Sequence, residues 1–118
     1  MIIVDTSVWI EHLRKTDTQL VQLLDKSLVL MHPFIIGELA CGNLKDRGNL
    51  LSLLAALPAA VTAETGEVLR FIEMHKFMGN GLGYIDMHLL VSAALSSTPI
   101  WTRDRRLAAC AANLNLSR

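Results

Sequence analysis

Short apolar runs alternate along this chain with longer segments in which apolar residues recur every three or four positions. The first run, at residues 2–5, has no alternating polar position, which is typical of a strand buried on both faces of a parallel sheet. Similar runs predict strands at 28–31 and 99–102. A short strand at 60–63 and an edge strand at 114–118 complete the expected sheet.

The segments between these runs have helical periodicity, with capping residues before them and glycine or proline after several of them. In the first of them, Trp9, Ile10 and Leu13 have the spacing expected of core positions. The predicted helices span residues 8–14, 16–25, 33–42, 49–57, 64–78, 84–97 and 105–113. Strands that alternate with helices predict an α/β fold, with a parallel sheet covered by helices on both faces. We expect one domain over residues 1–118, because this length suits a single core.

Four acidic residues stand where the pattern changes from apolar to polar: Asp5, Glu38, Asp86 and Asp104. Two of them follow predicted strands, and the carboxyl ends of parallel strands meet in one crevice. Carboxylates gathered there repel one another unless a cation lies between them. Oxygen ligands of this kind suit Mg²⁺ or Mn²⁺, so the sequence predicts a divalent-metal site.

Each acid also has a purely structural interpretation. Asp5 and Asp104 are both placed to cap a helix N-terminus, and Asp86 opens a helix whose dipole favours an acid. Ser7 is the better cap for the first helix, which leaves Asp5 free for another role. Glu38 lies in a helix that has no polar face. A functional site therefore explains this glutamate better than exposure to solvent without a role.

The composition limits which classes of function the chain can have. The formal net charge is zero, so the chain lacks the strongly basic balance typical of nucleic-acid-binding proteins, and a few placed arginines must hold any RNA. The hydrophobic fraction is 52%, which fits either a well-filled core or an apolar surface covered by a partner. No apolar run approaches the roughly 20 residues of a membrane span, and the N-terminus does not resemble a signal peptide. We therefore expect a cytoplasmic protein without a membrane segment.

Other metal and redox chemistry is not indicated. The two cysteines, Cys41 and Cys110, have no zinc-ligand spacing and are expected to be small buried hydrophobic residues. The four histidines show no HExxH spacing, and the glycine-rich stretch at 79–83 lacks the GK[ST] of a P-loop.

Four segments together resemble the PIN domain, and more closely the VapC-type toxins of bacterial toxin–antitoxin pairs. They are IVDTSVWIEHLR, IIGELACG, GLGYIDMHLLVSAAL and WTRDRRLAACA, in the family's order and spacing. The resemblance implies a three-layer α/β/α sandwich with a central parallel sheet and an acidic pocket that binds Mg²⁺ or Mn²⁺. It also implies an endoribonuclease, usually a homodimer, that a cognate antitoxin holds inactive.

Matched by position, Asp5, Glu38, Asp86 and Asp104 correspond to the family's acidic quartet. Thr6, Ser7 and Thr102 correspond to the hydroxyl residues that line it. The expected reaction is metal-assisted hydrolysis of RNA phosphodiester bonds. Candidates for phosphate contacts, each of which could equally be a solvated surface charge, are Arg14, Arg103, Arg105 and Arg106.

Three alternatives differ in function. A housekeeping RNA-processing nuclease would use the same site, and an adjacent upstream gene for a small DNA-binding protein would favour the toxin instead. A PIN-like module that binds RNA or protein without cutting is disfavoured by the complete quartet. A receiver-like signalling domain needs an adjacent acidic pair after the first strand, where this chain has Asp5 alone.

Overall fold

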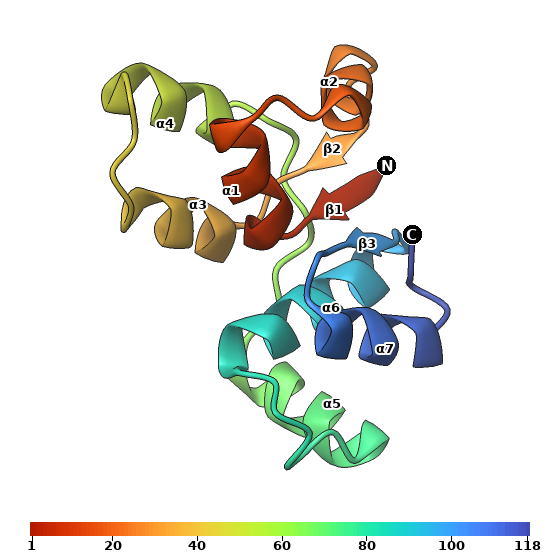
Figure 1. Ribbon diagram of the computed structural model, residues 1–118. Helices are drawn as coiled ribbons and strands as arrows, with labels where there is room; N and C mark the ends of the chain where they lie inside the picture. Colours follow the sequence, from red (N-terminus) through yellow and green to blue (C-terminus); the bar gives the residue numbers. More distant parts are fainter.

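Three parallel strands form the centre of the molecule, in the order β2-β1-β3 (Figure 1). The computed structural model describes all 118 residues. The strands are β1 (Ile2–Val4), β2 (Val29–Leu30) and β3 (Ile100–Trp101). In the register of the sheet, Ile3 pairs with Leu30 on one side and with Ile100 on the other. The central position of β1 explains its uniformly apolar sequence, since all three of its residues are buried.

Seven helices surround the sheet. Figure 1 shows α1, α3 and α4 grouped on one side of the strands, and α5, α6 and α7 on the other. The three-layer α/β/α sandwich expected from the sequence is thereby confirmed. None of these helices has the length and apolar character needed to cross a bilayer. Their bounds are α1 (Thr6–Arg14), α2 (Thr18–Asp25), α3 (Pro33–Ala40), α4 (Arg47–Ala55), α5 (Thr65–His75), α6 (Tyr84–Ser96) and α7 (Arg105–Asn113).

Helix α6 supplies much of the core. Every residue from Met87 to Ala93 is buried, and Leu89, Leu90 and Ala93 are fully inaccessible to solvent. A helix that is apolar nearly all round packs in an interior rather than on a surface. Helix α6 lies against β3 and α5, and it carries Asp86 in its first turn.

The two predicted outer strands are reduced to single bridges. Ala59, just before the predicted strand at 60–63, bridges Met31, and Ser117 in the predicted strand at 114–118 bridges Ile100. Residues 60–63 themselves form no strand, so that prediction is wrong. Pro58 lies just before the first bridge and has no backbone N–H to donate to a longer ladder.

Three side chains expected in the core are exposed. Ile10 and Leu13 are 44% and 40% exposed, because α1 turns Val8 and Trp9 toward the core and leaves the adjacent face of the helix open. Cys41 is also exposed, since it caps the free C-terminal end of α3, whereas Cys110 is buried as expected.

Four helices, α3 to α6, end earlier than periodicity predicts, and in two of them the backbone shows why. α5 stops at His75 and α6 at Ser96, because the next residues, Lys76 and Ser97, adopt left-handed conformations with φ of 54° and 51°. A left-handed residue ends the helical hydrogen-bond ladder.

The packing of α6 predicts a large difference between two leucines. Leu90→Ala, at a fully buried position, should lower the free energy of unfolding by about 2–5 kcal/mol. Leu69→Ala, at a position of α5 that is 52% exposed, should change it by less than about 0.5 kcal/mol. Chemical denaturation of the two variants checks this, and equal losses would contradict the central role of α6.

Candidate active site

Asp5 lies at the carboxyl end of β1, where the strand turns into α1. It occupies the N-cap position of α1 but makes no capping hydrogen bond with its side chain. Its Oδ2 atom instead accepts hydrogen bonds from Ser7 Oγ (2.7 Å) and Thr102 Oγ1 (2.8 Å). The prediction that Ser7 caps the helix is therefore wrong, while the Asp5 carboxylate is indeed free of a capping role. At 7% exposure, this carboxylate is buried at the base of the site.

The two hydroxyl groups that hold Asp5 are themselves fixed by the backbone. Ser7 Oγ accepts a hydrogen bond from Arg103 N, and Thr102 Oγ1 accepts one from Asp104 N, both at 3.0 Å. Each hydroxyl has a single proton, and both protons point at Asp5. This network joins the end of β1 to the loop after β3, two segments almost 100 residues apart in the chain.

Glu38 reaches the site from α3. Thr6 Oγ1 donates a hydrogen bond of 2.7 Å to Glu38 Oε1, so the first residue of α1 orients a carboxylate on another helix. His32 caps the N-terminus of α3, because its Nδ1 atom accepts a hydrogen bond from Phe34 N (3.0 Å). Pro33 then occupies the first helical position.

Asp86 lies in the first turn of α6, where its Oδ2 accepts from Gly83 N at 3.2 Å. Asp104 is the N-cap of α7, and its Oδ1 accepts from Arg106 N (2.8 Å) and Leu107 N (3.1 Å). The capping role that the sequence allowed for Asp104 is thus observed, but it occupies only one of the two oxygens.

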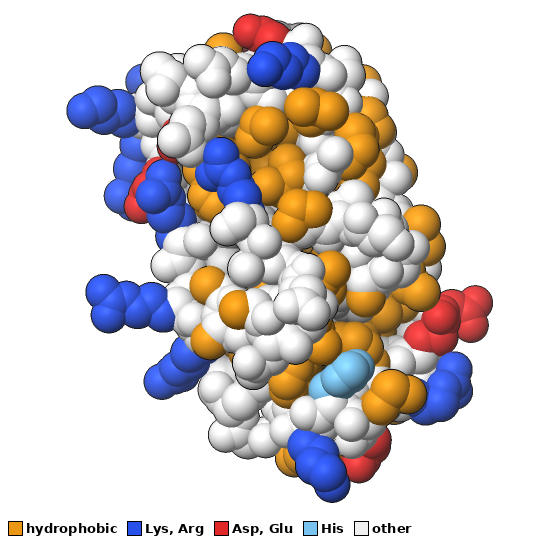
Figure 2. Space-filling model, turned by 90° about the vertical axis from the view of Figure 1, so that its right-hand side faces the viewer, with side chains coloured by type: hydrophobic (Ala, Val, Ile, Leu, Met, Phe, Trp, Pro, Cys, Tyr) orange, Lys and Arg blue, Asp and Glu red, His pale blue; other side chains and the backbone are white.

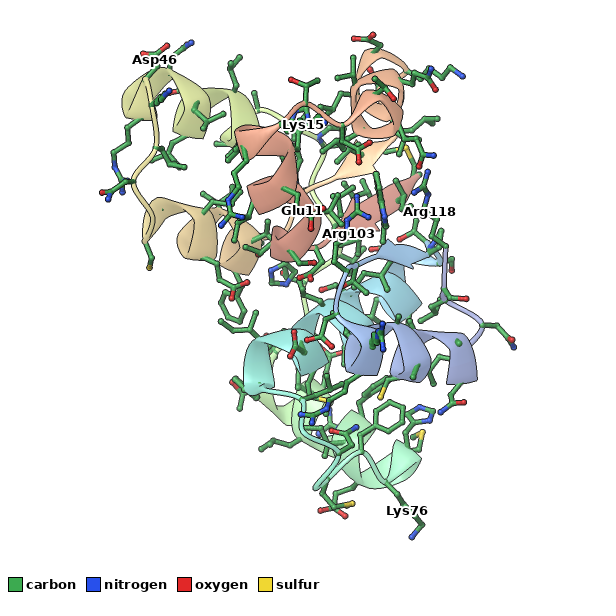
Figure 3. All side chains as sticks on the ribbon, viewed as in Figure 1. Glu11, Lys15, Asp46, Lys76, Arg103 and Arg118 are labelled. Atoms are coloured by element: carbon green, nitrogen blue, oxygen red, sulfur yellow. The ribbon has the colours of Figure 1, made fainter.

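The four carboxylates share one property. Each uses one oxygen for hydrogen bonds within the protein, and its second oxygen makes none. None of the four forms an ion pair with a lysine or arginine. The ion pairs of the chain both belong to Arg103, which contacts Glu11 at 2.9 Å and Asp17 at 3.1 Å. Figure 3 shows Arg103 beside Glu11 of α1.

The pKa of Asp86 depends on its burial and on the charges of the other three acids. It is raised above its ordinary value, first because burial disfavours the charged form, and then because Asp5, Asp104 and Glu38 add negative charge nearby. The hydrogen bond from Gly83 N opposes the shift. Asp5, Glu38 and Asp104 therefore each lie within electrostatic reach of Asp86, and none of the four acids is in an ion pair.

The donor set fits Mg²⁺ or Mn²⁺. All free donors are carboxylate oxygens, the ligands that these ions prefer. No three acidic, histidine or cysteine side chains lie close enough together to enclose an ion by themselves.

A cluster of aromatic and histidine side chains borders the acids, and the sequence pattern did not reveal it. His32 and His88 are 2% and 5% exposed, and their ring centroids lie 6.3 Å apart. Burial, with a smaller contribution from His88, lowers the pKa of His32 to about 4. Since His32 Nδ1 accepts a hydrogen bond, Nε2 carries the proton, so neither nitrogen offers a free lone pair to a metal.

The four candidate arginines differ in their surroundings. Arg103 is engaged by Glu11 and Asp17, and the guanidinium of Arg106 packs over Gly81, whose φ of 84° is left-handed. Arg105 is exposed at the start of α7, and Arg14 lies at the end of α1. The two arginines nearest the quartet along the chain and not in ion pairs are thus Arg105 and Arg106.

The raised pKa of Asp86 predicts a stability effect without any metal. When ionised, this residue destabilises the fold, because its folded pKa lies above its unfolded value. Asp86→Asn should therefore raise the melting temperature of the metal-free protein at neutral pH. The gain should shrink as the pH falls through the folded pKa, and vanish below the ordinary aspartate value of roughly 4.

Thermal melts between pH 3 and 8 check this prediction. Glu73→Gln on α5 is the matched control, since it removes the same charge from an exposed residue outside the quartet. A melting temperature that falls in Asp86→Asn at neutral pH would show that burial and the neighbouring acids do not disfavour the charged form of Asp86.

Comparison with known proteins agrees with this geometry. The sequence profile of the PIN domain matches residues 2–113. The chain is 50% identical over 113 residues to Ribonuclease VapC32 of Mycobacterium tuberculosis, in both the H37Rv and the CDC 1551 strains. The aligned region covers 94% of this chain and 91% of that relative. Fold, site and sequence together show that this chain belongs to the PIN-domain family.

Proposed function

We propose that this chain is an Mg²⁺- or Mn²⁺-dependent endoribonuclease that acts as the toxin of a toxin–antitoxin pair in the cytoplasm. The observation that carries the proposal is the uncompensated quartet, in which each carboxylate keeps one oxygen free of protein hydrogen bonds. The similarity of the chain to a protein named Ribonuclease VapC32 supports both RNA as the substrate and the role of a toxin.

The chain's own groups prepare the site for hydrolysis. Ser7 and Thr102 fix the Asp5 carboxylate, and Thr6 fixes Glu38, so these acids do not have to be reordered on binding. Asp5, Glu38 and Asp86 would hold the ion, directly or through water, and Asp104 would complete the site or orient the attacking water. When bound, the ion supplies Lewis-acid activation of the phosphate and of that water.

RNA would be held by few basic groups. Arg105 and Arg106 flank Asp104 and are free of ion pairs, so they are the first candidates for phosphate contacts. Arg103 can take part only by exchanging Glu11 or Asp17 for a phosphate, and Arg14 would contact RNA farther along α1.

A groove beside Glu38 suits the proposed antitoxin. It has a volume of about 370 Å³ and lies between α1, α3 and the start of α4. An amphipathic helix could bury its apolar face there and extend a basic residue, arginine above all, to Glu38 and the other acids. The apolar segment 91–95 of α6 does not contribute to this groove, since Val91 is buried in the core. The apolar residues that line the groove are Ile10, Leu13, Leu39, Leu44 and Leu50.

A homodimer is also part of the proposal. Several large apolar side chains in and just after α5 are exposed, among them Leu69 (52%), Met74 (74%) and Met78 (52%). On the face drawn in Figure 2, apolar side chains reach the surface in several clusters between the charged groups. A second copy of the chain could cover such clusters.

Loss of one quartet acid should abolish cleavage without unfolding the protein. Asp5→Asn removes a ligand charge, and losing several kcal/mol of transition-state stabilisation lowers the rate by about 100-fold or more. The measurement is cleavage of a structured RNA by purified protein in Mg²⁺ or Mn²⁺, with Asp25→Asn at the exposed end of α2 as control. Wild-type cleavage by Asp5→Asn would refute the assignment of this site.

The neutral net charge predicts a shallow salt dependence of RNA binding. With roughly two to four phosphates neutralised, the slope of log K against log salt for single-stranded RNA should be about −1.4 to −2.8. Equilibrium binding from low to moderate salt tests this. A slope several times steeper would mean that many more basic residues contact the RNA.

The toxin role predicts growth arrest that a partner relieves. The chain expressed alone should stop growth, and co-expression of the protein encoded immediately upstream should restore it. Leu13→Glu, which places a charge in the apolar groove, should stay toxic but escape rescue, while Leu53→Glu at a 60% exposed position of α4 should still be rescued. Soluble protein that cuts RNA yet never slows growth would favour the housekeeping nuclease.

A further inference from the structure

A second, mainly apolar pocket adjoins the acidic site along the exposed face of α3. It has a volume of about 220 Å³, and Glu38 of the quartet is one of the residues that line it. Glu38 is the only charged residue among those that line it: Pro33, Phe34, Gly37, Glu38, Cys41 and Ile85.

Two partly exposed aromatic rings pack against one buried histidine, His88: Phe34, which lines the pocket, and Tyr84, which lies outside its lining. Phe34 packs edge-on against His88 with ring centroids 4.7 Å apart, and Tyr84 packs against the same ring at 4.6 Å and 90°. His88 is only 5% exposed, whereas Phe34 and Tyr84 remain 38% and 45% exposed. Each of these two rings is therefore held in place on one side while a large part of it stays available to a ligand.

Gly37 keeps the pocket open. A Cβ atom at this position would meet no other atom within 4 Å, so packing does not require glycine there. In the interior of a helix, glycine costs about 1 kcal/mol relative to alanine. The residue thus gives up helix stability at a point where a larger side chain would project into the pocket.

The chemistry of the pocket selects its ligand. It has no basic side chain, and Glu38 at its edge repels anions, so it does not suit a phosphate. A flat, uncharged nucleobase suits it, because bases stack on exposed aromatic rings with little dependence on sequence. In single-stranded RNA, a phosphate held at the quartet would carry its neighbouring base toward this pocket.

We propose that this pocket binds the nucleobase next to the scissile phosphate, which stacks on Phe34 over Gly37. The proposal rests on the nuclease function and adds to it the recognition of an unpaired base. Selection then follows stacking strength rather than a hydrogen-bond code. The pocket restricts cleavage to segments whose bases can be turned outward, such as loops.

The test uses single-stranded oligoribonucleotides that carry 2-aminopurine at successive positions, titrated with full-length protein in which Asp5→Asn prevents cleavage. Stacking should quench the fluorescence at one position, beside the bond that the unmutated quartet cuts. In that background, Gly37→Leu and Phe34→Leu should each weaken binding by about 5- to 100-fold and abolish the quench. Gly48→Leu is the matched control, because it lies on exposed α4 with equally open space around its Cβ, and should change neither.

The possible outcomes distinguish a failure of the base-binding proposal from a failure of the proposed nuclease function. Normal quenching and affinity in Gly37→Leu and Phe34→Leu would overturn the pocket even if the wild-type protein cuts RNA. Gly37→Leu that loses antitoxin binding but keeps RNA affinity would assign the pocket to a protein side chain and also overturn the proposal. Melting temperatures identify any variant that does not fold, and Phe34→Leu then decides alone. A wild-type chain that cuts no RNA would refute the proposed function, while the quench would still decide whether a base binds here.

Discussion

Four carboxylates that no lysine or arginine pairs with are the constraint on which the organisation of this protein depends. Asp5, Glu38, Asp86 and Asp104 come from separate elements, and no lysine or arginine pairs with any of them. Burial raises the pKa of Asp86, and the negative charges of the other three acids raise it further, so folding places this carboxylate where its charged form is disfavoured. A protein tolerates such a cost at a functional site, and a divalent cation is the simplest group that relieves it.

The hydroxyl groups turn this cluster of charges into an ordered site. Thr6, Ser7 and Thr102 each donate to a carboxylate, and backbone N–H groups fix the last two hydroxyls in turn. The same network joins the carboxyl ends of β1 and β3. The stability of the sheet and the orientation of the acids are therefore coupled, as is typical of metal sites whose ligands are held by surrounding hydrogen bonds.

The sequence predicts the framework better than its surfaces. Apolar runs located β1, β2 and β3, and parallel topology then placed Asp5 and Asp104 at one edge of the sheet. Periodicity shows which residues share a helix face, but not what that face meets, so Ile10 and Leu13 were assigned to the core although they line a groove. The Ser7–Thr102 network and the ion pairs of Arg103 join segments far apart in the chain, and no local pattern encodes them. The cluster of His32, Phe34, Tyr84 and His88 was missed for the same reason.

The most direct test of this account is to locate the ion. Crystals grown with Mn²⁺ would give an anomalous difference map in which the metal appears without any assumption about its ligands. We expect one peak among the free oxygens of Asp5, Glu38, Asp86 and Asp104, with at least one of these carboxylates about 2.1–2.2 Å from the ion and water completing its shell. A map with no peak at the quartet at millimolar Mn²⁺, or with its peak elsewhere on the chain, would contradict the central claim.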